Sequence, residues 1–402
     1  MKKTGIIEQL LKLGDDWEVV DIVINENFKE VNLYLRYKKA FAPYPGSEEE
    51  YRIYDYTPER QIRHLDIFEY KVFLNVRIPR VKNNKSEIGT IELGWAGQRV
   101  SYTYLFEGRV IETLQMSKNQ TKTADYLETT FDIVHGIMKR AVARGLSRRG
   151  LDGTLALGID EKSYGNGQKY LTVLSDPVTK SVLDVIDGRK TDDAQELLSW
   201  TLSPAQLDQI LIVSMDMWKP YMNAVDEIVP QADIVHDKFH VAKYLNKAVD
   251  DVRKKEVKQQ DMLKGSKYVF LKNEENRSDA QNWKFEQIDQ INLKTSQAWK
   301  IKENFKGIYT LGKKQLCLHY FKDWYINALE SDIGPMVKVA GTMLRHLKGI
   351  VNSAVTDITN SITEGINSQI QVVKTVARGF ANVEGYRNAI LFFQGKLKMF
   401  PL

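Results

Sequence analysis

The 402-residue sequence has almost no cysteine and no long hydrophobic run. Cys317 is the only cysteine, which excludes an intramolecular disulfide and a zinc site built on paired cysteines. No stretch approaches the roughly 18 apolar residues of a membrane span, and the N-terminus has no apolar signal core. We therefore expect a cytoplasmic protein without a membrane partner.

A strong excess of positive charge is also missing. The chain has 57 Lys and Arg against 52 Asp and Glu, a formal net charge of +5. Total charge therefore does not require a nucleic-acid partner, and only local clusters of basic residues can indicate one. The composition is globular, with 43% hydrophobic residues. At roughly 100–200 residues per domain, this length predicts two to four domains.

The N-terminal part predicts strands followed by helices. Residues 1–100 contain strand-like runs from Trp17 to Ile24, Val31 to Tyr37 and Lys71 to Ile78, which predict a small β-rich module. Residues 101–150 change to helical periodicity, with a basic third helix. That order is typical of a helix-turn-helix, whose last helix enters the DNA major groove, although a helical linker with a solvated basic face gives the same pattern. The DNA-binding candidates here are Lys139, Arg140, Arg144, Arg148 and Arg149.

Residues 151–240 contain the clearest pattern. The order is three strands, a helix, a strand that ends at Asp216, a helix and a fifth strand, which is the order of a ribonuclease-H-like core. In such a core the ends of the first and fourth strands lie side by side, so we expect Asp160 next to Asp216. The next acidic candidate, Glu364, is 148 residues beyond Asp216, too far for a loop in a compact core.

We therefore predict an all-helical insertion over residues 241–350, with residues 351–402 completing the core. The expected fold class is α+β and multidomain: a β-rich module, helix-turn-helix-like helices, and a mixed α/β core interrupted by the insertion.

Three acidic residues carry the predicted chemistry. Asp160 and Asp216 each end an apolar run, and Glu364 lies near the start of an amphipathic helix. A Mg²⁺ site takes only one or two carboxylates, so three suffice for the two ions of a phosphoryl-transfer site on nucleic acid. Turn-capping aspartates and a helix N-terminal charge are the alternatives.

Polar residues near these acids are candidates for contact with a DNA backbone. The helix of Glu364 has an apolar stripe and an opposite face that ends in cations, a pattern that an ordinary solvated face also gives. Lys219 and Tyr221, just after Asp216, are expected to line a groove for the DNA backbone. The alternative is that they simply begin the next helix, since Pro220 suits a first turn. These candidates are Lys219, Tyr221, Asn367, Lys374 and Arg378.

Histidine and cysteine offer weaker alternatives. His236 and His240 have a spacing that binds zinc on a helix, but no HExxH glutamate accompanies them. Cys317 and His319 lack an obvious orienting acid, so the sequence does not favour a thiol enzyme. We expect no zinc.

Five colinear segments resemble the ISL-three family of bacterial insertion-sequence transposases. By that resemblance Asp160, Asp216 and Glu364 form the DDE triad, and Asp237 and His240 support it. The chain departs from the family pattern where the N-terminal zinc-binding cysteines are expected, at Ala42-Pro43-Tyr44-Pro45-Gly46 and near Asn83, so that module is degenerate. The segments are Gly158–Glu161, Ser214–Tyr221, Asp237–His240, Asn246–Arg253 and Glu364–Phe380.

The resemblance implies a transposase with a ribonuclease-H-like core, active in the bacterial cytoplasm and on the nucleoid when bound to DNA. Its expected partners are double-stranded terminal inverted repeats and target DNA, and its expected cofactors are two Mg²⁺ or Mn²⁺ ions. Two transposon ends must be joined, so we expect a homodimer. The alternatives are a metal-dependent nuclease of the same fold, such as a junction resolvase, and a DNA-binding protein that has lost catalysis.

Overall fold

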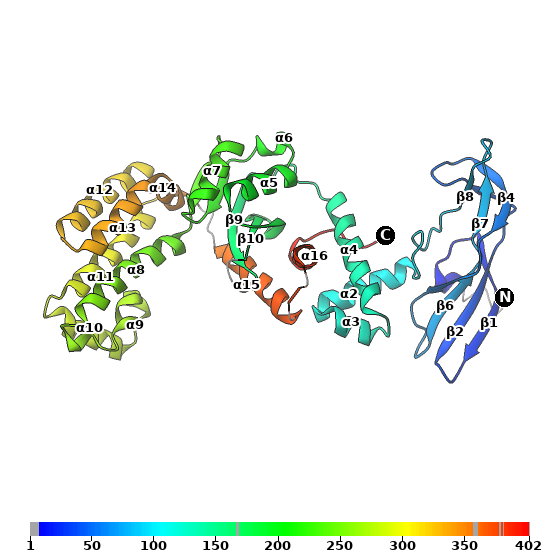
Figure 1. The fold of residues 1–402 in the computed structure, drawn as a ribbon, viewed down its shortest axis with the longest axis horizontal. Helices are drawn as coiled ribbons and strands as arrows, with labels where there is room; N and C mark the ends of the chain where they lie inside the picture. The colour runs from blue at the N-terminus through cyan, green and yellow to red at the C-terminus, as the bar shows by residue number, and fades with distance from the viewer. Residues whose placement is uncertain (1–7, 166–168, 357–360, 378, 381, 402) are drawn as a thin grey trace. The chain divides into compact units, whose positions relative to one another are not determined.

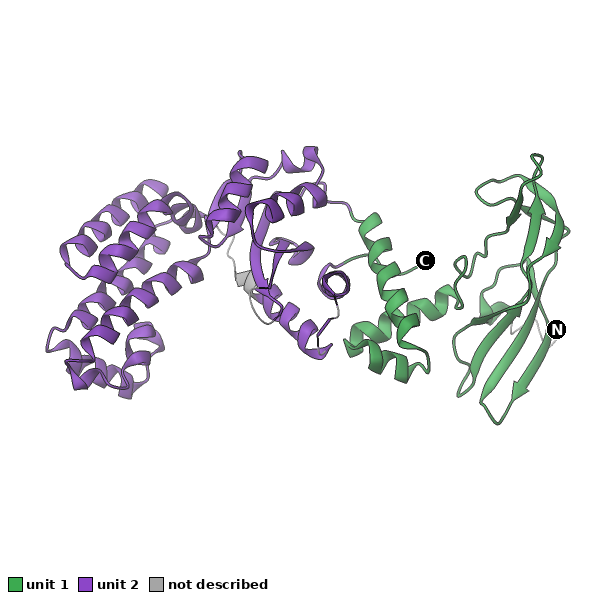
Figure 2. Ribbon diagram, in the orientation of Figure 1, with its two compact units in different colours: residues 1–149, 397–402 green, residues 150–396 purple. Residues whose placement is uncertain are grey.

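The computed structural model describes residues 8–165, 169–356, 361–377, 379–380 and 382–401, without the side chains of 361–364. The chain divides into two compact units, shown in different colours in Figure 2. Unit 1 comprises residues 1–149 and 397–402, and unit 2 comprises residues 150–396. Within the described ranges, no helix combines the length and apolarity needed to cross a membrane.

Unit 1 contains two four-stranded sheets (Figure 1). The first has the order β1-β2-β6-β5, with β2 and β6 parallel, and the second has the order β3-β4-β7-β8. Alternate side chains such as Leu33, Leu74 and Val81 are buried in a common core, as the period-2 pattern predicts. The strands are β1 Trp17–Asn25, β2 Glu30–Tyr37, β3 Phe41–Pro43, β4 Glu50–Tyr56, β5 Arg60–Arg63, β6 Lys71–Val76, β7 Pro79–Lys82 and β8 Ile88–Thr90.

Three helices follow the sheets in unit 1: α2 Tyr104–Ser117, α3 Gln120–Tyr126 and α4 Phe131–Ser147. Each begins after a polar residue whose side chain accepts a hydrogen bond from the backbone three residues later. These N-caps are Thr103, Asn119 and Thr130, and such caps satisfy backbone donors that a first turn leaves unpaired. The three predicted helices of residues 101–150 are therefore present.

Unit 2 is organised around a five-stranded sheet with the order β11-β10-β9-β12-β13. β9, β10 and β11 form an antiparallel meander, whereas β12 and β13 run parallel to β9. This strand sequence is the one predicted. The strands are β9 Ala156–Ser163, β10 Tyr170–Asp176, β11 Ser181–Asp187, β12 Ile212–Met215 and β13 Asp233–His236.

Helices cover this sheet (Figure 1). Leu198 of α5 and Val225 of α7 share a buried core with Ile159 and Met215 of the sheet. Elsewhere on the sheet, α14 packs against β13, α15 against β9 and α16 against β11. The helices are α5 Thr191–Thr201, α6 Pro204–Leu207, α7 Lys219–Ile228, α14 Leu347–Val355, α15 Ser361–Val376 and α16 Val383–Gln394.

Between β13 and α14 the chain forms a helical subdomain with its own core, centred on residues such as Val249, Phe270, Trp324 and Met343. α8 begins directly after β13, and α14 returns to the sheet, where Asn352 Nδ2 donates to the Ile234 carbonyl at 3.0 Å. The elements are α8 Lys238–Glu256, η1 Asp261–Leu263, α9 Lys267–Leu271, η2 Glu274–Asn276, α10 Asp279–Asp289, α11 Lys294–Phe305, η3 Lys306–Thr310, α12 Lys314–Glu330 and α13 Gly334–Arg345.

Candidate active site

Asp160 lies on β9 with a buried side chain. Its neighbours Leu157 and Ile159 point into the α5–α7 core, so alternation places Asp160 on the opposite face of the sheet, toward α15. The Glu161 backbone N–H donates to Asp160 Oδ1 at 2.7 Å, and Asn367 Nδ2 donates to Oδ2 at 2.5 Å. Burial raises the pKa of Asp160 to about 6, with the charges of Asp216 and Asp237 adding to the effect and His240 opposing it.

Asp216 follows β12 directly. In the parallel pairing of β12 with β9, Ser214 is opposite Gly158 and Met215 is opposite Ile159, so the next step brings Asp216 alongside Asp160. The Trp218 backbone N–H donates to Asp216 Oδ1 at 3.0 Å, at the start of α7. Burial raises the pKa of Asp216, and the charges of His240 and Lys243 lower it.

α15 brings a third element to these aspartates. Ile366, Ile370 and Val373 are buried, as the predicted apolar stripe requires, and Asn367 contacts Asp160. Asn367 was expected to contact DNA, and sequence reasoning missed its bond to a carboxylate 207 residues away. Position 364 is within α15, one turn before Asn367, but the side chain of Glu364 lies outside the described residues. Residues three apart share a helix face, so position 364 and Asn367 are neighbours there.

Asp237 and His240 lie at the same edge of the sheet. The Asp237 side chain caps α8 by accepting from the Phe239 backbone N–H at 2.9 Å, and His240 Nε2 is 3.8 Å from Asp237 Oδ2. His236 ends β13 instead of joining α8, so it does not share a helix with His240. Its buried ring packs edge-on against His346, and burial lowers the pKa of His236 to about 4. His236 and His240 therefore lack the arrangement in which two histidines on neighbouring turns of one helix bind zinc.

Glu161, Arg189 and Trp218 form a polar cluster beside the aspartates that sequence reasoning missed. Arg189 Nη1 is 3.0 Å from Glu161 Oε2, and its guanidinium lies 3.8 Å from the ring centre of Tyr170 and 5.1 Å from that of Trp218. Trp218 Nε1 donates to the Arg189 carbonyl at 3.1 Å. The Glu161 charge also raises the pKa of Asp216. The only sequence signal was the position of Glu161 and Trp218 inside the quoted motifs.

The predicted DNA-contact residues of unit 2 have different surroundings. Lys219 is exposed at the first turn of α7. Burial lowers the pKa of Lys162, and the nearby charge of Lys374 lowers it further. Tyr221, in contrast, is completely buried, and its hydroxyl is 2.9 Å from Thr172 Oγ1. That burial leaves Tyr221 no surface for a DNA backbone, which corrects the expectation. Arg378 lies outside the described residues.

In unit 1, α4 carries its basic residues in two groups. Lys139 is exposed, and Arg140 lies over the Tyr102 ring at 5.2 Å. Arg144 instead binds the buried carboxylate of Glu107 and the Met399 carbonyl, each at 2.5 Å. Arg148 donates to the Phe400 carbonyl at 2.7 Å, and Arg149 follows the helix end. These contacts make Arg144 a packing residue of unit 1.

The segments aligned with the family's zinc-binding cysteines are neighbours in unit 1. They lie at the β3–β4 and β7–β8 hairpins, where a Cβ added to Gly89 would be 2.7 Å from Pro45 Cδ and 3.0 Å from the Tyr44 ring. Gly89 is thus required for this close packing. The described side chains contain no group of three or more His, Cys, Asp or Glu arranged to hold a metal ion.

Comparison with known proteins identifies the family. Residues 157–390, more than half of the chain, match the ISL-three family of DDE enzymes, whose description is "Transposase". The chain belongs to this transposase family. The match includes Asp160, Asp216, Glu364 and the whole helical subdomain, and it confirms the resemblance indicated by the sequence motifs.

Curated relatives that are themselves transposases align with most of this chain. This chain is 28% identical over 337 residues to the "Transposase for insertion sequence element IS1001" of Bordetella parapertussis, and the alignment covers 82% of each chain. It is 25% identical over 355 residues to the transposase for IS1557 of Mycobacterium tuberculosis, covering 80% of this chain and 78% of the relative. The "Drosophila P element transposase strand transfer complex" aligns at 8% identity and a TM-score of 0.39, over 76% of this chain and 94% of that one, which is too weak to carry an argument.

Proposed function

We propose that this transposase cleaves transposon ends and joins them to target DNA at the edge of the sheet where Asp160, Asp216 and α15 meet. The observation that carries the proposal is the register of β12 on β9, which brings Asp216 alongside Asp160. The strand order supports a ribonuclease-H-like core, built from residues 151–240 and 351–396 and interrupted by the insertion of residues 241–350. Residues 397–402, which were expected to complete the core, belong to unit 1 instead. Glu364 completes the acidic triad in this proposal.

The residues present fit a pair of divalent metal ions, Mg²⁺ or Mn²⁺. Asp160 and Asp216 are oxygen ligands whose burial disfavours their own charge, and Asn367 Oδ1 is buried without a hydrogen-bond partner among the described residues. A cation beside these oxygens would offset the cost of burying the two carboxylate charges and the cost of leaving Asn367 Oδ1 unpaired. Asp160, Asp216 and Glu364 would hold the ions, which when bound polarise a phosphate and activate a water or a DNA 3′-hydroxyl for in-line attack.

The protein's own groups position the acids in this mechanism. Asn367 and the Glu161 backbone each hold one oxygen of Asp160, which fixes the orientation of the carboxylate. Asp237 places a further carboxyl group, and His240 an imidazole, beside Asp160 and Asp216. Glu161 and two aromatic rings hold the guanidinium of Arg189 at the rim of the site. A guanidinium matches the geometry of a phosphate, so we propose that Arg189 contacts the DNA backbone there.

For recognition we propose that unit 1 binds the terminal inverted repeats, through the β-rich module of residues 1–100 and the helix-turn-helix-like helices of residues 101–150. Exposed Lys139 on α4 and Lys219 near the acids are the best-placed cations for phosphate contacts. Because two ends must be joined to one target, the proposed active assembly is a homodimer.

The test uses labelled DNA taken from the flanks of the gene, with and without Mg²⁺. We expect metal-dependent nicking at an end, followed by joining of the freed 3′-hydroxyl to a second duplex. Nicking without joining would favour the nuclease of the same fold. Binding without cutting in Mg²⁺ or Mn²⁺ would refute the proposal and leave a DNA-binding protein.

Replacing Asn367 with Ala is expected to reduce strand joining by about 10- to 100-fold, as loss of a residue that orients a metal ligand typically does. The Mg²⁺ concentration needed for half-maximal joining should rise as well, because Asp160 loses its orienting donor. Gln369→Ala, at an exposed position of the same helix, is the control and should change neither quantity. An unchanged Mg²⁺ dependence in Asn367→Ala would count against the positioning role.

Replacing Asp160 with Asn should raise the thermal midpoint of the metal-free protein in EDTA at pH 7.5. The folded pKa of about 6 exceeds the ordinary value, so the carboxylate lowers stability as pH rises through that range. A pKa shift of this size corresponds to about 1–3 kcal/mol of unfolding free energy. The gain should shrink as pH falls through 6 and vanish below about pH 3, where Asp160 is neutral in both the folded and the unfolded state. Mg²⁺ should stabilise the wild type more than the variant. A variant less stable than wild type in EDTA would contradict this.

A further inference from the structure

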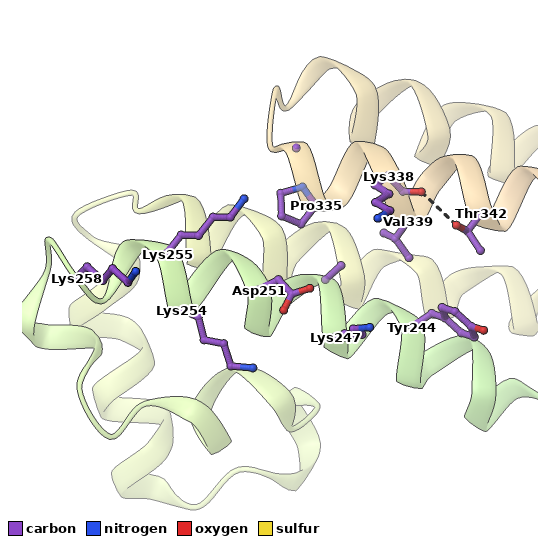
Figure 3. A pocket seen from close by; sticks show the side chains of 12 residues that line it. Tyr244, Lys247, Asp251, Lys254, Lys255, Lys258, Pro335, Lys338, Val339 and Thr342 are labelled. Carbon is purple, nitrogen blue, oxygen red and sulfur yellow. Dashed lines mark hydrogen bonds between the residues drawn. The ribbon is translucent and has the colours of Figure 1, made fainter. Parts of the chain in front are cut away.

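A lysine-rich groove lies between α8 and α13 of the helical subdomain (Figure 3). Its volume is about 650 Å³, and the apolar side chains of Ala248 and Val339 are among those that line it. A single acid, Asp251, is among the residues that line it. The lining lysines are Lys247, Lys254, Lys255, Lys258 and Lys338.

Most of these lysines have no internal partner. Lys254 is bound to Asp250 at 2.8 Å, and Figure 3 shows it pointing away from α13, whereas Lys255 reaches toward Pro335. The other four are exposed and form no ion pair with any residue that the structure describes. The groove therefore carries positive charge that an external anion would stabilise.

The charge is spread along a line. Lys247, Asp251 and Lys255 are each separated by four residues, which places them on one face of α8, and Lys258 follows in the turn after the helix. From Lys247 to Lys255 the helix rises about 12 Å. Along the axis of duplex DNA each strand carries one phosphate about every 3.4 Å, so this length spans three to four base-pair steps of a duplex. An extended polyanion fits this line better than a single phosphate group does.

We propose that this groove binds the phosphate backbone of duplex DNA without reading its sequence. Lysine is a point charge on a flexible stem, and the lining residues include no Arg, Asn or Gln, the side chains whose paired donors and acceptors read base edges. Such a surface suits DNA whose sequence is not fixed, such as a target site or the DNA that flanks a transposon end. The identity of the polyanion rests on the proposed function.

The test compares two variants with the same change in charge. One carries Gln at Lys247, Lys255, Lys258 and Lys338. The control carries Gln at Lys294, Lys313, Lys314 and Lys322, which are exposed on the same subdomain but do not line the groove. Fluorescence anisotropy with a random-sequence duplex, in EDTA over a range of KCl concentrations, gives the affinity and its salt dependence for the full-length proteins.

The groove variant should bind more than about tenfold more weakly near 0.1 M salt, with a log–log salt slope reduced by about three to four, because each lost phosphate contact removes about 0.9. The control should keep the wild-type slope. Equal slopes in the two variants would overturn the inference. So would displacement of the random duplex by a nucleoside triphosphate, or tighter binding of duplex RNA, since each indicates a different ligand.

The joining assay in Mg²⁺ separates this inference from the proposed function. A wild type that binds with the expected slope but never cuts DNA would overturn the proposed function and leave the groove's role standing. A wild type that cuts and joins, beside a groove variant with an unchanged salt slope, would overturn only the groove's role.

Discussion

Replacing Asp216 with Asn is expected to abolish cleavage and joining while DNA binding persists. Asp216 ends β12 beside Asp160, and an amide neither carries the charge nor binds a divalent cation as a carboxylate does. The loss should exceed the roughly 100-fold limit typical of residues that only orient a metal ligand. The measurement is the rate of joining on flanking DNA, with a gel-shift assay for binding.

The matched control is Asp226→Asn, which changes an exposed carboxylate on α7, the helix that follows β12 and Asp216. It should join DNA at the wild-type rate. Residual joining by Asp216→Asn within tenfold of the wild type would show that this edge of the sheet is not where the chemistry occurs.

Replacing Arg387 with Met should cost about 3–5 kcal/mol of unfolding free energy, because it leaves the buried carboxylate of Asp184 without its partner. Arg387 of α16 binds Asp184 of β11 through two hydrogen bonds, both 2.6 Å long. α16 in turn contacts α15, where the Tyr386 hydroxyl donates to the Ile370 carbonyl at 3.3 Å. This ion pair therefore holds the helix that carries Asn367 against the sheet.

Urea unfolding measures this cost, with Arg345→Met as an exposed control expected to change stability by less than about 0.5 kcal/mol. The double variant Arg387→Met with Asp184→Asn should recover most of the loss, since the buried charge is then removed as well. A single variant as stable as the control would show that the pair adds nothing to the docking of α16.

The strand order of unit 2 was predictable because each strand is a short apolar run whose ends are marked by polar residues. Asp216 follows such a run directly, whereas Asp160 lies inside β9, which continues to Ser163 beyond the apolar run. The parallel pairing of β12 with β9 still brings the two aspartates together. The pairing in unit 1 was not predictable beyond the first hairpin. Its β2–β6 contact is parallel and joins segments separated by other strands, so it depends on packing that local patterns do not encode.

Side-chain roles were less predictable than strands. Arg144 looks like part of a basic DNA-binding face in the sequence, but its partner Glu107 lies on a different helix, and no local pattern distinguishes a buried ion pair from a solvated cation. Tyr221 follows Lys219 and Pro220 at the start of α7, and the first turn of that helix points it into the core. The bond from Asn367 to Asp160 depends on tertiary packing alone.

The last described residues belong to unit 1, where Leu397 packs against Gly145 and the Met399 carbonyl accepts from Arg144. During translation, unit 1 therefore lacks its contacts with Leu397 and Met399 when residue 149 emerges from the ribosome. It must wait for the intervening 150–396 segment, which takes about 10 to 50 s at bacterial elongation rates. Nascent chains that stop short of residue 397 would leave Arg144 without its bond to the Met399 carbonyl and Gly145 without its contact to Leu397, so we expect truncated products to be degraded more readily than the full chain.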